Sequence, residues 1–127
     1  MKFNLETARA TYRIQSYNDH EIRVGGQCLT QSAIILPETL IVSGLPATSQ
    51  DLTSEHFQQL RQLQPRPELV LLGTGARIHF PPPALMQILT SAKIGLEVMT
   101  TAAACRTYNV LVAEERQVAL MVFMIAL

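Results

Sequence analysis

The chain has 127 residues, of which 48% are hydrophobic and 16% charged, so it can build one compact domain with a sizeable core and is not expected to be disordered. Ten basic residues balance ten acidic ones, and no dense Lys/Arg cluster occurs. A nucleic-acid partner is therefore disfavoured, and we expect a single domain over residues 1–127.

The ends of the sequence carry no recognisable export or membrane signal. Residues 1–12 lack the apolar run of a secretory signal. The longest apolar run, VALMVFMIAL at 118–127, is too short for a bilayer, which takes about 20 residues. We expect a cytoplasmic chain with no membrane span, in which Cys28 and Cys105 stay reduced. Neither cysteine belongs to a Cys/His cluster with metal-ligand spacing, so no metal site is predicted.

The first part of the chain has the pattern of a β-meander. Polar and apolar residues alternate over residues 12–16, as in a half-buried strand. Residues 28–36 and 39–44 are predicted to be two further strands, separated at Pro37, which cannot donate a ladder hydrogen bond. The turn residues that delimit the meander are Asn18-Asp19 and Gly25-Gly26.

A short helix is predicted after this meander. Thr53 is a plausible N-cap, and Leu52 and Phe57 are spaced as a hydrophobic staple around it. Phe57 and Leu60 provide the buried face, and Pro65 ends the helix.

The second half changes to an order of β-α-β-α-β. The continuous apolar run 68–73 is typical of a strand covered on both faces. A helix begins at the prolines 81–83 and is expected to end at a C-cap on Gly95. The expected elements that follow are a strand at 96–99, a helix starting at Thr100 or Thr101, and a strand within 116–123. This order indicates an α/β core with at least two parallel strands.

A candidate ligand crevice lies at two loops that follow strands. Gly73-Thr74-Gly75 follows the first buried strand, and Thr100-Thr101 begins a helix whose free amides and positive dipole end favour anions. If the two strands are parallel neighbours, both loops meet at the carboxyl edge of the sheet. The dinucleotide fingerprint GxGxxG is incomplete and the phosphate loop GxxxxGK[ST] is absent, so no cofactor is predicted. A plain tight turn at Gly73–Gly75 is the alternative.

Other polar residues near this crevice are candidates for ligand contact. Arg77 and His79 could supply charge or a proton, or simply be solvated, while Arg106 and Asn109 share one helix face. Asn109 is a poor helix former, which suggests a specific hydrogen bond that could brace the site. No Ser/His/Asp triad or paired-carboxylate arrangement is discernible, so no catalytic residue is predicted.

Cys105 has two interpretations. It lies in the second helical turn near the positive dipole end, which lowers a thiol pKa and would suit a nucleophile. The neighbouring run Ala102–Ala104 instead indicates tight packing, and a buried structural thiol is the favoured interpretation.

The second half also resembles a known family. PELVLLGTG, IGLEVMTTAAACRTYNVL and AEERQVALMVF are similar to the domain shared by the mitochondrial respiratory complex I assembly factor and many small bacterial and archaeal proteins of unknown function, over roughly residues 65–122. The resemblance implies a three-layer β/β/α-type α/β fold with a mixed central sheet, helices on one side and a smaller β layer on the other. It implies no established activity or cofactor. The family usually has Glu-Gly-Arg where this chain has Glu114-Glu115-Arg116, so either Glu115 adopts a positive φ, at a cost of about 1 kcal/mol, or the turn differs.

Two functions remain open on the sequence. The first is a non-catalytic protein-interaction or assembly module, with an unidentified protein partner and possible homo-oligomers; the apolar tail 124–127 is one candidate contact. The second is a binder of, or an enzyme acting on, a small anionic metabolite at the Gly73–Gly75/Thr100-Thr101 crevice, with Arg77, Arg106 or Asn109 converging on it.

Overall fold

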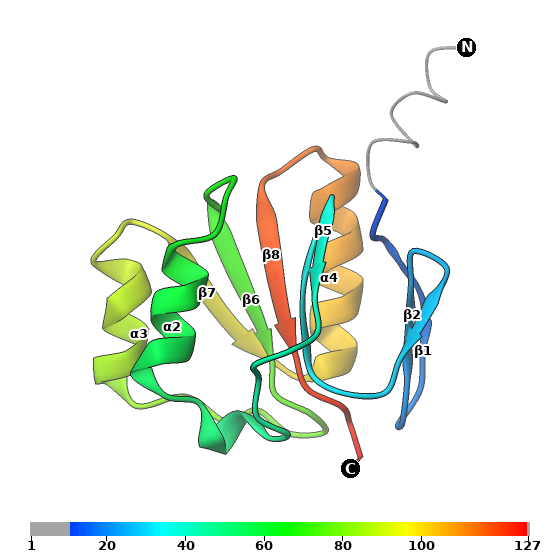
Figure 1. The fold of residues 1–127 in the computed structure, drawn as a ribbon, viewed down its shortest axis with the longest axis horizontal. Helices are drawn as coiled ribbons and strands as arrows, with labels where there is room; N and C mark the ends of the chain where they lie inside the picture. The colour runs from blue at the N-terminus through cyan, green and yellow to red at the C-terminus, as the bar shows by residue number, and fades with distance from the viewer. Residues whose placement is uncertain (1–10, 127) are drawn as a thin grey trace.

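The fold is built around two β-sheets. A computed structural model describes residues 11–126 (Figure 1). The smaller sheet is an antiparallel meander in the order β1-β2-β3. Its strands are β1 (Ile14–Tyr17), β2 (Ile22–Val24) and β3 (Gln27–Leu29).

The larger sheet is central and mixed, with the order β5-β4-β8-β6-β7. Its middle strand β8 runs antiparallel to β4 on one side and parallel to β6 on the other. Strand β6 is in turn parallel to β7. The strands are β4 (Ala33–Leu36), β5 (Thr39–Ile41), β6 (Leu69–Gly73), β7 (Gly95–Met99) and β8 (Val118–Val122). Strand β5 therefore forms one edge of this sheet and β7 the other.

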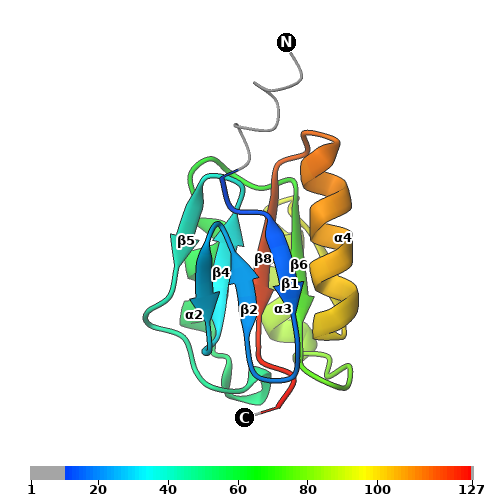
Figure 2. The same cartoon turned by 90° about the vertical axis from the view of Figure 1, so that its right-hand side faces the viewer.

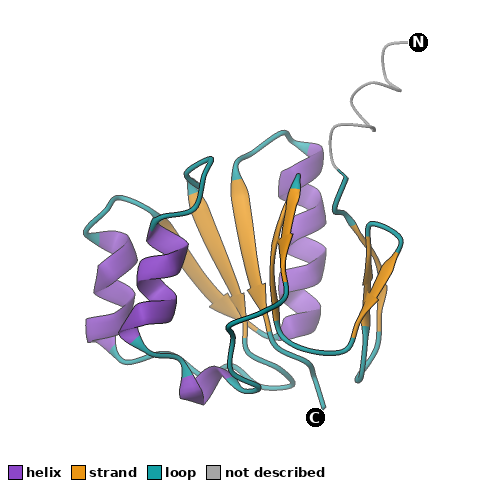
Figure 3. Cartoon of the chain, viewed as in Figure 1, coloured by secondary structure: helices purple, strands orange, loops and turns teal. Residues whose placement is uncertain are grey.

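Helices cover both faces of the central sheet. On one face lie α2 (Ser54–Arg61) and α3 (Pro83–Thr90), which pack on each other (Figures 1 and 3). On the opposite face α4 (Thr101–Ala113) packs on β6 and β8, beside the small sheet (Figure 2). The three-layer α/β class is thus confirmed, with the refinement that α4 shares its layer with the small sheet.

Alternating side chains of the central sheet divide the interior into two cores. Ala33 and Ile35 of β4 face the core under α4 and the small sheet, whereas Ile34 and Leu36 face the core under α2 and α3. All five residues of β8 are buried, because this strand is covered on both faces.

One predicted strand is in fact two. Residues 28–36 do not form one strand, because the chain leaves the small sheet after Leu29 and enters the central sheet at Ala33. At the crossing, the Ser32 hydroxyl donates to the carbonyl of Pro46 at 2.6 Å. The polar residues between the strands therefore mark a change of sheet that the apolar pattern on either side concealed.

The helix ends were predicted with mixed success. Thr53 is the N-cap of α2, and its N–H donates to His56 Nδ1 at 2.9 Å. The C-cap predicted at Gly95 is wrong: α3 ends at Thr90, and Lys93 holds the positive φ, at 63°. Gly95 instead begins β7, where an added Cβ would lie 3.1 Å from the Leu69 side chain, so glycine permits close approach to β6.

The turn after α4 resolves the open question at Glu115. Its φ is 61°, so the non-glycine residue does adopt the left-handed conformation in which relatives with Glu-Gly-Arg would place glycine. The turn is closed by the Arg116 N–H, which donates to the Leu111 carbonyl at 3.0 Å.

Candidate functional site

The two predicted loops do meet at one edge of the sheet. Strands β6 and β7 are parallel neighbours in register, with Gly73 opposite Met99. The Thr101 N–H donates to the Gly75 carbonyl at 2.9 Å, and the Gly75 N–H donates back to Thr101 Oγ1 at 2.8 Å. The β6–α3 loop and the start of α4 are thereby tied together.

Thr100 and Thr101 have different structural roles. Thr100 is the N-cap of α4, with its hydroxyl accepting from the Ala103 N–H at 3.3 Å. Thr101 is buried, and its hydroxyl donates to the Phe123 carbonyl at 2.6 Å, which joins the loops to the end of β8. The amide of Thr74 also donates inward, to the Met99 carbonyl at 3.0 Å. The amides of Thr74, Gly75, Thr101 and Ala103 thus have partners within the protein.

Close packing explains the small residues at this junction. A Cβ added to Gly73 would lie 3.0 Å from the Ala104 Cβ and 3.1 Å from the Thr101 Cα, closer than ordinary contact. Because one of these atoms is backbone, the neighbour cannot easily yield. Gly73 and Ala104 therefore allow α4 to lie directly against the end of β6.

The loop after Gly75 is held in shape from within. The Thr74 hydroxyl donates to the Arg77 carbonyl at 2.6 Å and accepts from the His79 N–H at 3.1 Å. This arrangement leaves the side chains of Arg77 and His79 exposed. It also leaves Phe80 70% exposed, the most exposed large hydrophobic residue in the described chain.

Beside this loop lies a small cavity of about 250 Å³, on the same edge of the sheet. It is bounded by the η1 turn (Ser49–Asp51) and the segment before it, the β6–α3 loop and the C-terminal tail. Its lining residues are Ala47, Thr48, Ser49, Gln50, Thr74, Gly75, Ala76, Arg77, His79, Phe123, Met124 and Ile125. The sequence pointed to Arg77 and His79 but gave no signal for Thr48 and Ser49, which come from a loop far earlier in the chain.

Arg106 and Asn109 do not reach this cavity. Arg106 donates from Nη1 to the Tyr17 hydroxyl at 2.9 Å. Asn109 accepts from the Ile14 N–H at 2.9 Å and donates to the Ile14 carbonyl at 2.7 Å. Both side chains attach β1 to α4, so the specific hydrogen bond expected of Asn109 exists but braces the small sheet rather than the crevice.

Cys105 is a buried thiol rather than an exposed one. Its side chain is 1% exposed, and burial raises the pKa of the thiol to about 12, although the nearby Arg106 acts in the opposite direction. A thiol held protonated in this way is a poor nucleophile at neutral pH. Cys28 is exposed, and a hydrogen bond to Glu21, at 3.3 Å, raises the pKa of its thiol.

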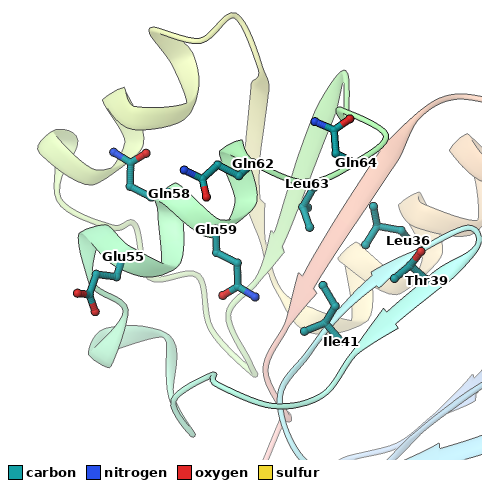
Figure 4. A pocket seen from close by; sticks show the side chains of 9 residues that line it. All are labelled: Leu36, Thr39, Ile41, Glu55, Gln58, Gln59, Gln62, Leu63 and Gln64. Atoms are coloured by element: carbon teal, nitrogen blue, oxygen red, sulfur yellow. The ribbon is translucent and has the colours of Figure 1, made fainter.

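A larger open groove lies between the edge strand β5 and helix α2 (Figure 4). Its volume is about 580 Å³. The lining combines apolar side chains with several side-chain amides and one carboxylate. These residues are Leu36, Thr39, Ile41, Glu55, Gln58, Gln59, Gln62, Leu63 and Gln64. The sequence carries no signal for this groove, because glutamines on a helix are typical of a solvated face.

Within the described residues, 11–126, there is neither a membrane-spanning helix nor a cluster of metal ligands. No helix there is both long enough and apolar enough to cross a bilayer. The same residues contain no group of three or more His, Cys, Asp or Glu side chains placed to hold a metal ion.

The fold defines a small three-layer α/β domain with a mixed five-stranded sheet and open pockets at its surface. The chain belongs to the family described as "Protein of unknown function (DUF498/DUF598)", which matches residues 14–123. The mouse protein "NADH dehydrogenase [ubiquinone] 1 alpha subcomplex assembly factor 3" is 32% identical over 111 residues, and the human protein of the same name matches to the same extent. The match covers 87% of this chain but only 59% of those proteins.

Solved bacterial structures share the fold. A crystal structure of a Bordetella parapertussis protein superposes with a TM-score of 0.83 at 33% identity, covering 92% of this chain and 98% of that one. A solution structure from Bordetella pertussis, described as a Mth938-like domain, has a TM-score of 0.77 at 28% identity, over 92% and 88% of the two chains. The resemblance seen in the sequence is confirmed by these matches.

Proposed function

We propose that this protein is a non-catalytic interaction module that binds an extended segment of a partner protein in the groove between β5 and α2. The observation that carries the proposal is the position of this groove along an edge strand of the central sheet. An edge strand has backbone N–H and C=O groups on its outer side, onto which a further strand can add.

The side chains of β5 support this mode of binding. Thr39 and Ile41 line the groove, whereas Leu40 packs on the opposite side against the core beneath the small sheet. This alternation presents one face of β5 to the groove. A partner strand added beside β5 would continue the sheet and direct alternate side chains into the groove.

The lining chemistry favours a polypeptide as the occupant. Leu36, Ile41 and Leu63 offer apolar contact, and the amides of four glutamines can both donate to and accept from peptide groups. Glu55 is the only charged residue among the described residues that line the groove. The best-matched partner is therefore an extended, mainly apolar segment whose flank is neutral or basic, since an acidic flank would be repelled.

The relatives support the same class of function. The mouse and human proteins are named assembly factors, a role that depends on protein contacts, and the present chain corresponds to 59% of their length. No Ser/His/Asp triad was discernible in the sequence, and Cys105, the thiol weighed as a nucleophile, is buried.

Affinity purification from a lysate of the native organism, followed by mass spectrometry, tests the proposal. Thr39→Lys places a charged side chain on the edge strand and should reduce recovery of the partner about tenfold or more, equivalent to about 1.4 kcal/mol. Thr30→Lys is the matched control, because Thr30 is exposed but lies outside the groove. Equal recovery with both variants, or no partner with the unmodified protein, would contradict the proposal.

A further inference from the structure

We propose that the cavity between η1, the β6–α3 loop and the C-terminal tail binds a small oxyanion of the phosphate type. This inference goes beyond the interaction function, because the cavity shares no lining residue with the groove beside β5. The ligand would be free phosphate or the phosphate group of a small molecule.

The charge of the lining favours an anion. Among the described residues that line the cavity, Arg77 and His79 are the only ones with ionisable side chains, and none is acidic. In the described part of the chain, neither side chain makes an ion pair or a hydrogen bond. The nearby Asp51 is outside the lining and accepts a hydrogen bond from the Thr48 hydroxyl at 3.1 Å. Arg77 is therefore a free guanidinium beside a cavity, ready to form paired hydrogen bonds with an oxyanion.

Ser49 contributes a buried hydroxyl without a hydrogen-bond partner. Ser49 lines the cavity, is only 8% exposed, and has no hydrogen-bond partner for its hydroxyl oxygen. It is the only such buried side-chain atom in the described chain. Buried polar groups are nearly always paired, and an exception calls for a ligand or water that satisfies it. Ser49 also borders the pocket beside Phe80, and its hydroxyl is closed to solvent in the unliganded protein, so its side chain would rotate to donate to an oxyanion in this cavity.

The frame around the cavity is already in place. Thr74 holds the loop that carries Arg77 and His79 through its two hydrogen bonds, and Thr101 ties Gly75 to the end of β8. Gly75 has a φ of 103°, which a residue with a side chain rarely adopts. The predicted Gly-Thr-Gly loop thus contributes by positioning Arg77, since its amides are used within the protein. A volume of about 250 Å³ leaves room for a phosphate group with a small substituent.

The test is a titration of ¹⁵N-labelled protein with inorganic phosphate, followed by NMR and by thermal unfolding. Sodium chloride at equal ionic strength is the reference. We expect saturable shifts confined to residues 47–50, 74–79 and 123–125, the segments that line the cavity, and a rise in melting temperature with phosphate alone. Glycerol 3-phosphate in a second titration distinguishes a phosphate ester, which would bind more tightly, from free phosphate. Shifts that are equal in chloride, or that map elsewhere, would overturn the proposal.

Two substitutions in the cavity and two control substitutions outside it sharpen the test. Arg77→Ala should weaken phosphate binding about tenfold or more, whereas Arg61→Ala, an exposed arginine on α2, should leave it unchanged. Ser49→Ala should weaken binding several-fold while leaving the melting temperature of the unliganded protein unchanged or higher, because it removes an unpaired buried hydroxyl. Thr39→Lys should not affect phosphate binding, so the two proposals can fail separately. Equal affinities for Arg77→Ala and Arg61→Ala would refute the anion site.

Discussion

Asn109 and Ile14 are joined by a pair of hydrogen bonds across 95 positions of sequence. The side-chain amide of Asn109 accepts from the Ile14 N–H and donates to the Ile14 carbonyl, at 2.9 and 2.7 Å. In this way a helix residue takes the place of a neighbouring strand at the edge of β1. The backbone at Ile14, itself a core residue, would otherwise have two unpaired polar groups.

Asn109→Ala should therefore lower the free energy of unfolding by about 1–3 kcal/mol, the usual cost of leaving buried polar groups unpaired. Urea denaturation measures this change. Arg106→Ala is the control on the same helix, because its bond to Tyr17 is exposed and should be worth less than about 0.5 kcal/mol. If the two variants lose equal stability, the amide pair does not hold β1 to α4.

Thr101→Val should be considerably more destabilising than Thr100→Val. Valine keeps the shape of threonine but leaves the Gly75 N–H and the Phe123 carbonyl without the buried hydroxyl that joins them, at a cost of about 2–3 kcal/mol. Thr100 only caps the helix, and its loss should cost about 1 kcal/mol. Denaturant unfolding of the two variants decides the point, and equal losses would contradict a bridging role for Thr101.

Lys93→Gly should stabilise the protein by about 0.5–1 kcal/mol. Lys93 has a φ of 63°, which is unfavourable for a residue with a Cβ, and glycine removes that strain at some cost in unfolded-chain entropy. Gln87→Gly, at an exposed position inside α3, should have the opposite effect, a loss of about 1 kcal/mol. Melting temperatures of the two variants should move in opposite directions, and a loss at Lys93→Gly would mean that its side chain makes a compensating contact.

The two cysteines should differ in reactivity. Iodoacetamide at pH 8 should modify exposed Cys28 in the native protein and reach Cys105 only after unfolding in guanidinium, because burial keeps Cys105 protonated and inaccessible. Mass spectrometry of labelled peptides gives the answer. Rapid native labelling of Cys105 would revive its interpretation as a nucleophile.

The burial of the Cys105 thiol should make the free energy of unfolding fall at alkaline pH. The Cys105 thiol has a pKa of about 12 when folded, against 9.0 for the unperturbed thiol, so the unfolded chain loses its proton first. The free energy of unfolding that Cys105 contributes is intact below pH 9. It is lost as pH rises from 9 toward 12, with a slope of about 1.4 kcal/mol per pH unit. Denaturant unfolding between pH 9 and 10 should show a shallower decline for Cys105→Ala than for the unmodified protein.

Part of this structure followed directly from local sequence patterns. Three features depend on neighbours in sequence: the continuous apolar run at 68–73, the threonine caps expected at Thr53 and at Thr100 or Thr101, and the alternation of strand and helix in the second half. The order of strands and helices also indicates parallel strands, and the meeting of the two loops was expected on the condition that β6 and β7 are neighbours, which they are. The family resemblance added the three-layer arrangement.

Other features depended on residues that are distant in sequence. Only the fold brings Ser49 and Arg77 to the same cavity, places Asn109 against Ile14 and opens a groove between β5 and α2. Gly95 looked like a helix cap but is a glycine because Leu69 lies close to it on the neighbouring strand. The amides of Gly75 and Thr101 looked free to bind an anion but pair across the junction. The sequence by itself determined most of the elements, through periodicity and capping, but not the division of residues 28–36 between two sheets. Tertiary packing decided that division, and it decided which polar groups are satisfied and which remain open to a partner.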